Sequence, residues 1–149
     1  MNSAILQTLC KAVIPLLLMT AIWFFLRGHN EPGGGFIAGL VFASAYVLYG
    51  LAFGPQAVRE SMRLSPRTLM AFGLLLSVAA GLIGVFDHQA FLTGLWTEFE
   101  TGFGKLKLGT PLLFDLGVML VVIGAVNSIL LELTEAGESN PQSQGEEAA

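Results

Sequence analysis

Four long apolar stretches, separated by shorter polar connections, dominate the pattern of this chain. They cover residues 5–26, 36–53, 68–86 and 112–131. A helix needs about 20 apolar residues to cross the hydrocarbon core of a bilayer, with a range of ~17–25. The pattern therefore predicts an all-α integral membrane protein with four transmembrane helices.

Two of these predicted helices have recognisable starts. Ser65-Pro66 precedes the third apolar stretch, and Thr110-Pro111 precedes the fourth. A hydroxyl side chain can cap the first N–H groups of a helix, and proline is well tolerated in the first helical turn. We therefore expect both helices to begin at these dipeptides.

The connection between the third and fourth stretches, residues 87–110, is the longest. Residues 91–99 are rich in β-branched and aromatic side chains, and residues 105–108 alternate Lys-Leu-Lys-Leu. Alternation with a period of two is typical of a strand. Trp96 suits the headgroup zone of a membrane. We predict a short extracytoplasmic β-hairpin-like loop here.

The last residues differ from the rest of the chain. From Thr134 onward they are acidic, small or polar, and include Gly137, Pro141 and Gly145. Such a segment has too few apolar residues to fold. We expect a transmembrane domain over residues 1–133 and a disordered acidic tail over residues 134–149.

Basic residues set the expected orientation. Arg59, Arg63 and Arg67 lie in the second connection, and Lys11 falls on the same side; Arg27, Lys105 and Lys107 fall on the other. Because basic residues favour the cytoplasmic side, this bias predicts a multi-pass membrane protein with both termini in the cytoplasm.

The composition supports a membrane protein and excludes several other classes. Of 149 residues, 54% are hydrophobic and 12% are charged, whereas a soluble domain carries roughly 25% charged residues. The seven Lys and Arg residues are too few and too scattered to bind nucleic acid. Cys10 stands alone, and no sequence pattern indicates a nucleophile–base pair, a phosphate loop or a metal cluster. We therefore expect no enzyme activity, cofactor or metal.

The first connection, Arg-Gly-His-Asn-Glu-Pro-Gly-Gly-Gly-Phe at residues 27–36, has an unusual composition for so short a link. The glycines could relieve crowding where the second helix begins. Their N–H groups could instead bind an anionic or carbonyl group of a partner or shape a water-filled entrance, or the segment could be a hinge. The expected hairpin residues are Asn30, Pro32, Gly33, Gly34, Gly35 and Phe36.

Few ionisable residues fall within the apolar stretches. Asp115 is the one carboxylate clearly inside a stretch. An intramembrane acid is a candidate to carry a proton or bind a cation, although a carboxylate near a helix start can also be stabilised by the helix dipole. His29 and Asp87, at the membrane edges, are further ion-pathway candidates or solvated interfacial residues. Asn127 is a polar residue inside the fourth stretch, and we expect its side chain to form an interhelical hydrogen bond.

Small residues recur four positions apart along three of the stretches. Such faces let transmembrane helices approach closely. They could pack against one another within this chain, or some could face other subunits. The expected packing positions are Gly39 and Ala43 in the second stretch, Gly73, Ser77 and Gly81 in the third, and Gly124 in the fourth.

Two segments resemble a known family. Residues 28–40, Gly-His-Asn-Glu-Pro-Gly-Gly-Gly-Phe-Ile-Ala-Gly-Leu, are similar to the hallmark of the B subunit of Mrp-type (Mnh or Sha) multisubunit sodium/proton antiporters. Residues 91–96 and 107–117 look like that family's second block. The resemblance covers roughly residues 7–133. Glu31 departs from the family, which commonly has a small or neutral residue there.

The resemblance implies a small integral subunit of a large complex in the prokaryotic inner membrane, which uses a proton gradient to exchange H⁺ for cytoplasmic Na⁺. The partners would be the other antiporter subunits, membrane lipid, and Na⁺ and H⁺ as transported ions. The larger subunits of such complexes resemble proton-pumping modules of respiratory complex I. The B subunit would then serve assembly and could line or gate an ion pathway.

Two alternatives remain open at the level of sequence. The chain could be the equivalent subunit of a membrane-bound hydrogenase or a similar redox-driven ion pump, since neither metal nor quinone ligands would have to lie in it. It could also be an autonomous small oligomeric transporter, although its scarcity of intramembrane charge argues against that.

Overall fold

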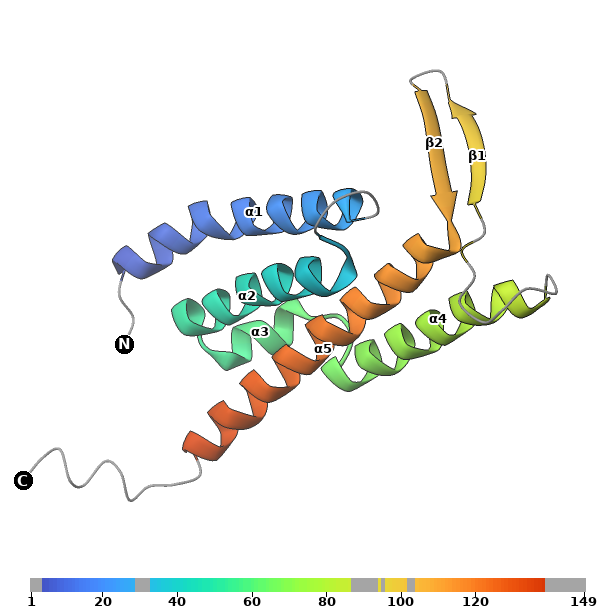
Figure 1. Cartoon of the computed structure of the whole chain (residues 1–149). Helices are drawn as coiled ribbons and strands as arrows, with labels where there is room; N and C mark the ends of the chain where they lie inside the picture. Colours follow the sequence, from blue (N-terminus) through green and yellow to red (C-terminus); the bar gives the residue numbers. More distant parts are fainter. Residues whose placement is uncertain (1–3, 29–32, 87–93, 95, 102–103, 139–149) are drawn as a thin grey trace, which may run out of the picture.

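The fold is a set of long helices with one two-stranded ribbon (Figure 1). This computed structural model describes residues 4–28, 33–86, 94, 96–101 and 104–138. The elements are α1 (Ala4–Arg27), α2 (Gly35–Phe53), α3 (Pro55–Ser61), α4 (Pro66–Phe86), β1 (Trp96–Thr101), β2 (Gly104–Gly109) and α5 (Thr110–Glu138).

Four of the helices are long and apolar enough to cross a membrane: Ala4–Arg27, Gly35–Phe53, Pro66–Ile83 and Thr110–Ala136. They correspond to the four stretches expected from the sequence. The prediction of an all-α membrane protein with four transmembrane helices is confirmed.

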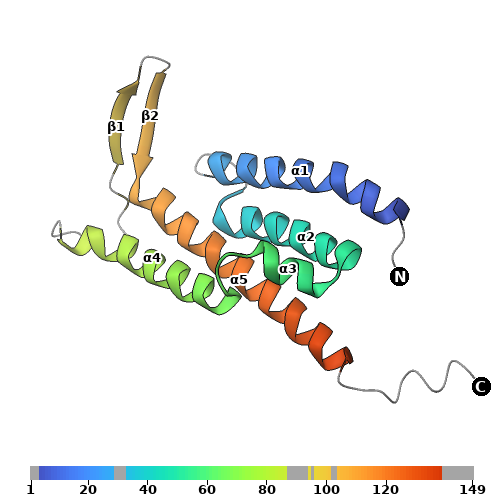
Figure 2. The same ribbon diagram turned by 180° about the vertical axis from the view of Figure 1, so that it is seen from behind.

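The long helices lie in a row, in the order α1, α2, α5, α4, as both views show (Figures 1 and 2). α5 packs against α2 on one side and against α4 on the other, while α1 packs on the far side of α2. α2 and α5 run in parallel, because Gly35 lies against Asp115 and Gly39 against Met119. α4 runs antiparallel to α5, since Gly73 contacts Gly117 and Met70 contacts Gly124.

A small core joins the helices of this row. Ala38 of α2 and Met119 and Ile123 of α5 are buried together. Side chains from the outer helices cover them: Phe24 and Phe25 of α1 and Leu69 of α4. Each long helix therefore contributes to one shared apolar cluster, although most of its own surface faces outward.

The short helix α3 was not predicted from the sequence. It begins at Pro55, directly after Gly54, whose φ of 92° is a backbone conformation that suits glycine. Proline at the first helical position and Arg59 in the last turn are both favourable in a helix. With 7 residues, α3 is too short to show a clear hydrophobic period.

The predicted start of α4 at Ser65-Pro66 is confirmed in detail. The backbone N–H of Thr68 donates to Ser65 Oγ at 3.2 Å, and the N–H of Leu69 donates to the Ser65 carbonyl at 3.0 Å. Ser65 is thus the N-cap, and Pro66 occupies the first turn, where its missing N–H costs nothing.

Two antiparallel strands occupy the connection between α4 and α5. β1 pairs with β2 so that Trp96 lies opposite Gly109 and Thr101 lies opposite Gly104. Part of the stretch expected to form strand, residues 91–93 and 95, lies outside the described residues. The ribbon stands at the end of the helix row where α5 begins (Figure 1).

α5 is longer than the sequence indicates. It continues through residues 134–138, which were expected to belong to the disordered tail. Thr134 Oγ1 donates to the carbonyls of Leu130 and Leu131, and Glu135 forms an ion pair with Arg59 of α3. These contacts lie on the polar last turns of the helix, beyond its apolar stretch. Residues 139–149 lie outside the described part of the chain.

Candidate functional site

The glycine-rich hairpin between α1 and α2 is closed by one carbonyl group. The oxygen of Phe24 accepts hydrogen bonds from the N–H groups of Gly28, at 3.1 Å, and Gly34, at 3.2 Å. A Cβ added to Gly33 would lie 2.8 Å from that oxygen, and one added to Gly28 would meet backbone atoms of Gly34. The two sides of the hairpin therefore touch backbone to backbone, which only glycine allows.

Gly34 has the most demanding backbone conformation of this hairpin. Its φ of 93° and ψ of −176° lie in a region that is essentially restricted to glycine. Its carbonyl accepts the first bond of α2, from Ala38 N–H at 3.0 Å. Gly34 is therefore the N-cap of α2. One interpretation of the sequence required the glycine N–H groups to be free to bind a partner. The N–H of Gly34 is not free, because it donates to the Phe24 carbonyl.

The start of α2 lies directly against Asp115 of α5. A Cβ added to Gly35 would clash with the Asp115 carbonyl and would lie 2.9 Å from its Cα. A Cβ added to Gly34 would lie 3.3 Å from the carboxylate oxygen Oδ2. The glycines thus relieve crowding, as one interpretation of the sequence expected, but Gly35 does so against α5 rather than against α1.

Asp115 is partly buried at this junction. Its carboxylate lies beside the first turn of α2, where unsatisfied N–H groups and the helix dipole stabilise negative charge. A carboxylate in this position can exchange a proton or contribute oxygen atoms to a cation. We call the set Gly34, Gly35 and Asp115 the glycine–aspartate junction.

Several expected site residues cannot be placed. His29, Asn30 and Pro32 lie outside the described residues, and so does Asp87. Phe36 is 58% exposed on the surface of α2, next to the junction. The structure therefore brings Asp115 together with the glycines of the hairpin, a contact that the sequence analysis did not foresee.

The small-residue positions lie at helix–helix contacts within the chain. A Cβ on Gly39 would lie 3.0 Å from the Met119 carbonyl, one on Gly73 would lie 2.6 Å from the Gly117 carbonyl, and one on Gly124 would lie 2.6 Å from the Pro66 carbonyl. Ser77 Oγ donates to the Phe114 carbonyl at 3.3 Å. Ala43 and Gly81 are also buried.

Gly117 is a close-packing residue that the sequence analysis missed. A Cβ there would meet Ser77 Oγ and would lie 2.6 Å from the Gly73 carbonyl. Its spacing from Gly124 is two helical turns, so both glycines lie on the face of α5 toward α4. That seven-residue spacing is the signal that could have identified it.

Asn127 does not form the predicted interhelical hydrogen bond. Its Nδ2 donates to the carbonyl of Ile123 in its own helix, at 2.8 Å. Its side chain is fully buried, and its Oδ1 has no hydrogen-bond partner among the described residues.

Metal-binding groups are scarce in the described residues. No group of three or more His, Cys, Asp or Glu side chains there is close enough to hold an ion. Asp115 by itself offers at most two oxygen ligands, so a cation held at the junction would need further oxygens from the backbone, water or a partner.

Comparison with known proteins identifies the family. The model of a domain related to the MnhB subunit of Na⁺/H⁺ antiporters matches residues 5–128. Two Staphylococcus aureus proteins named as antiporter subunit mnhB2, from strains Newman and COL, are 37% identical over 138 residues. The match covers 89% of this chain and 95% of each relative.

A solved structure agrees with these matches. The structure of the Mrp complex from Dietzia sp. DQ12-45-1b contains a chain that superposes with a TM-score of 0.74 at 32% identity. The match covers 87% of this chain and 14% of that chain, so this protein corresponds to a small part of a much longer polypeptide. The fold, the glycine hairpin and the sequence matches agree: this chain belongs to the MnhB family of antiporter subunits.

Proposed function

We propose that this chain is the MnhB-type subunit of a multisubunit Na⁺/H⁺ antiporter and that its glycine–aspartate junction borders the ion pathway. The family match and the Mrp-complex neighbour support the antiporter over a hydrogenase-type ion pump or an autonomous transporter. The family is that of a transporter component, and the chain is a multi-pass membrane protein.

One observation carries the second part of the proposal. Asp115 lies in a membrane-spanning helix, and a Cβ added to Gly34 would lie 3.3 Å from its carboxylate oxygen Oδ2. A carboxylate is costly to keep in a membrane and is usually retained for a function. Any side chain at position 34 would touch that carboxylate, and glycine avoids this contact.

The chain would work with the other subunits of the complex. Its long helices bury only 11–28% of their spanning windows within the chain, which leaves wide surfaces for neighbouring subunits and lipid. Transport of Na⁺ and H⁺ would be a property of the assembled complex in the prokaryotic inner membrane. Both termini would face the cytoplasm, as the distribution of basic residues predicts.

Substitution of Asp115 by Asn tests the role of the junction. The side chain keeps its size but loses its charge, so we expect the complex to assemble while Na⁺/H⁺ exchange falls at least about ten-fold, which is ~1.4 kcal/mol in an activation or binding step. Exchange would be followed as Na⁺-induced collapse of the pH gradient in everted membrane vesicles. Purification of the tagged chain with its companions, identified by mass spectrometry, measures assembly.

The matched control is Glu135→Gln, which removes a carboxylate from the exposed end of the same helix. It should leave exchange unchanged. Normal exchange with unchanged ion affinity in Asp115→Asn would exclude an ion contact at the junction. Recovery of the wild-type chain alone, or together with hydrogenase subunits, would contradict the antiporter assignment itself.

A further inference from the structure

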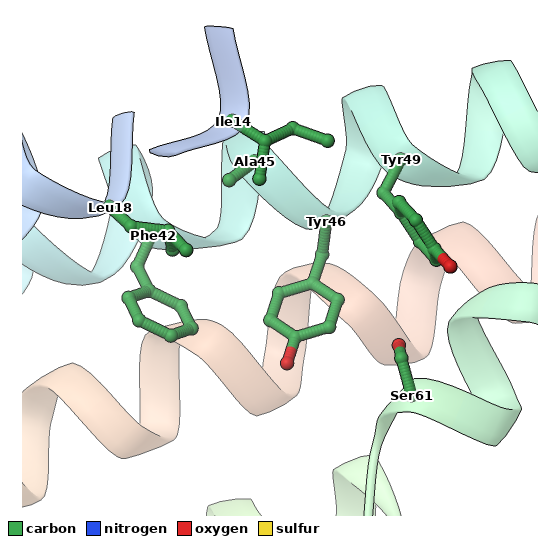
Figure 3. Close-up of a pocket in the computed structure, with 7 residues that line it drawn as sticks. All are labelled: Ile14, Leu18, Phe42, Ala45, Tyr46, Tyr49 and Ser61. Atoms are coloured by element: carbon green, nitrogen blue, oxygen red, sulfur yellow. The ribbon is translucent and has the colours of Figure 1, made fainter. Parts of the chain in front are cut away.

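An open groove lies between α1 and α2, at the side of the molecule where α3 is attached (Figure 3). Its volume is about 170 Å³. The lining side chains include Ile14 and Leu18 from α1, Phe42, Tyr46 and Tyr49 from α2, and Ser61 from α3. The groove is open to the outside of the helix row, so a molecule in the surrounding membrane can enter it.

The lining of the groove changes along its length. Leu18 and Phe42 supply only carbon surface at the end toward the middle of the helices. Tyr46, Tyr49 and Ser61 add hydroxyl groups toward α3, where Figure 3 shows the Ser61 side chain directed into the space between the two tyrosines. Side chains with an apolar body and a polar tip are typical of the membrane–water interface. The groove therefore runs from a hydrocarbon environment to an interfacial one.

A basic residue, Lys11, lies on α1 beyond the lining side chains, toward the end of α1 that is nearest to α3. Lys11 precedes Ile14 and Leu18 by three and seven residues, so the three share one face of α1. Gln7 Nε2 donates to the Ala52 carbonyl at 3.3 Å, which places this end of α1 beside the end of α2 that leads into α3. Lys11 is exposed, and no acidic partner for it is found among the described residues.

We infer that this groove holds an acyl chain of an anionic phospholipid whose phosphate group is bound by Lys11. From Lys11 to Leu18, α1 rises about 10 Å, at 1.5 Å per residue. This length carries the lipid from its headgroup, at Lys11, into the hydrocarbon zone, beside Leu18 and Phe42. The tyrosine and serine hydroxyls lie between, at the depth of the ester groups.

A helix of a partner subunit fits the groove less well. Transmembrane helices associate through small residues that permit close approach, whereas this groove is lined mainly by large aliphatic and aromatic side chains. A partner helix would also have to cover the charge of Lys11 or supply an acid for it. A flexible acyl chain fills an irregular apolar surface, and its own phosphate neutralises the lysine.

Photo-crosslinking in native membranes tests this inference with the full chain in its complex. The photoreactive residue p-benzoylphenylalanine would replace Ile14 in the groove. In a second variant it would replace Leu75, which is 67% exposed on the outer surface of α4, to report the bulk lipid. After irradiation, intact-mass and peptide analysis would give the ratio of anionic to zwitterionic phospholipid adducts at each position.

We expect that ratio to be about five-fold higher at residue 14 than at residue 75, since one lysine near the surface contributes about that factor. Lys11→Gln should return it to the bulk value, whereas Arg67→Gln, at the same end of the molecule but on α4, should not change it. Equal ratios at residues 14 and 75 would overturn the inference. A protein–protein adduct as the main product at residue 14 would overturn it in favour of a partner helix. The result is independent of whether Asp115 borders the ion pathway.

Discussion

Individual glycines set how closely the backbones of α1, α2 and α5 approach one another. Gly28, Gly33, Gly34 and Gly35 each lie where an added Cβ would meet another part of the chain, and Gly34 also needs its positive φ. The sequence showed that the hairpin was too rich in glycine for an ordinary link. It could not show which backbone each glycine approaches, because that depends on the packing of α5, which is distant in sequence.

Gly35→Ala is expected to destabilise the protein by roughly 1–3 kcal/mol, because the new methyl group would overlap the backbone of Asp115. An alanine in an unobstructed helix would instead be stabilising. The thermal stability of the detergent-purified chain, followed by fluorescence-detected gel filtration, measures the effect. Ser44→Ala, on the exposed side of α2, should shift it by no more than about 0.5 kcal/mol. A Gly35→Ala protein as stable as wild type would show that α2 and α5 are not in close contact.

Asn127→Leu is expected to stabilise the isolated chain by about 1–3 kcal/mol, since it removes a buried oxygen that has no donor among the described residues. Leucine has the same number of side-chain heavy atoms as asparagine, with the same branching at Cγ. Reversible unfolding in a denaturing detergent measures the change. A loss of stability would instead mean that the Asn127 oxygen is satisfied by water or by a group outside the described residues.

At the scale of the elements, apolar stretches and start signals located the long helices. The Ser65-Pro66 start of α4 and the membrane-spanning lengths follow from local sequence, so they could be predicted. α3 was missed because seven residues are too few to show a hydrophobic period. The end of α5 was misplaced because its last turns are polar; there Glu135 forms an exposed ion pair with Arg59 of α3. Side-chain contacts between elements that are distant along the chain cannot be predicted from local sequence.

The contact between α4 and α5 depends on small residues over two turns of each helix. Gly73→Ile is expected to cost ~3 kcal/mol or more, because its branched side chain would collide with the Gly117 carbonyl and Val121 backbone, neither of which can move alone. Leu75→Ile, two residues further along and facing outward, is the matched control and should have little effect. Thermal stability and the yield of assembled complex would both be measured. If Gly73→Ile assembles normally, α4 and α5 must be able to separate without loss of the fold.

At the scale of the whole molecule, the helices form an open row rather than a closed bundle (Figure 2). Large apolar side chains such as Leu16 on α1 and Phe72 on α4 are 62% exposed on the outside of the row. The sequence predicted the number of spanning helices but not their order in space, because stripes of small residues do not say which helix meets which. The groove between α1 and α2 likewise arises only from that order.

The row places α3 and the β1–β2 ribbon at opposite ends of the helices, which predicts opposite sides of the membrane. In a Cys10→Ser background, a cysteine at Ser65 should react with an impermeant maleimide only in everted vesicles. A cysteine at Lys107 should react only in intact cells or spheroplasts. Labelling of both from the same side would contradict a four-span topology, and the reversed pattern would place the termini outside the cytoplasm.

The parallel arrangement of α2 and α5 has a consequence for biosynthesis. The chain emerges from the ribosome with α1 and α2 first, but the partner of Gly35 is Asp115, on the last helix. The start of α2 in the nascent α1–α2 hairpin therefore stays without this partner until α4, the ribbon and α5 have all been synthesised. A chain that stalls before α5 lacks both Met119 and Ile123 and would present an unfinished surface that a membrane protease can recognise. The contact between α2 and α5 thus forms only after the last helix has been made.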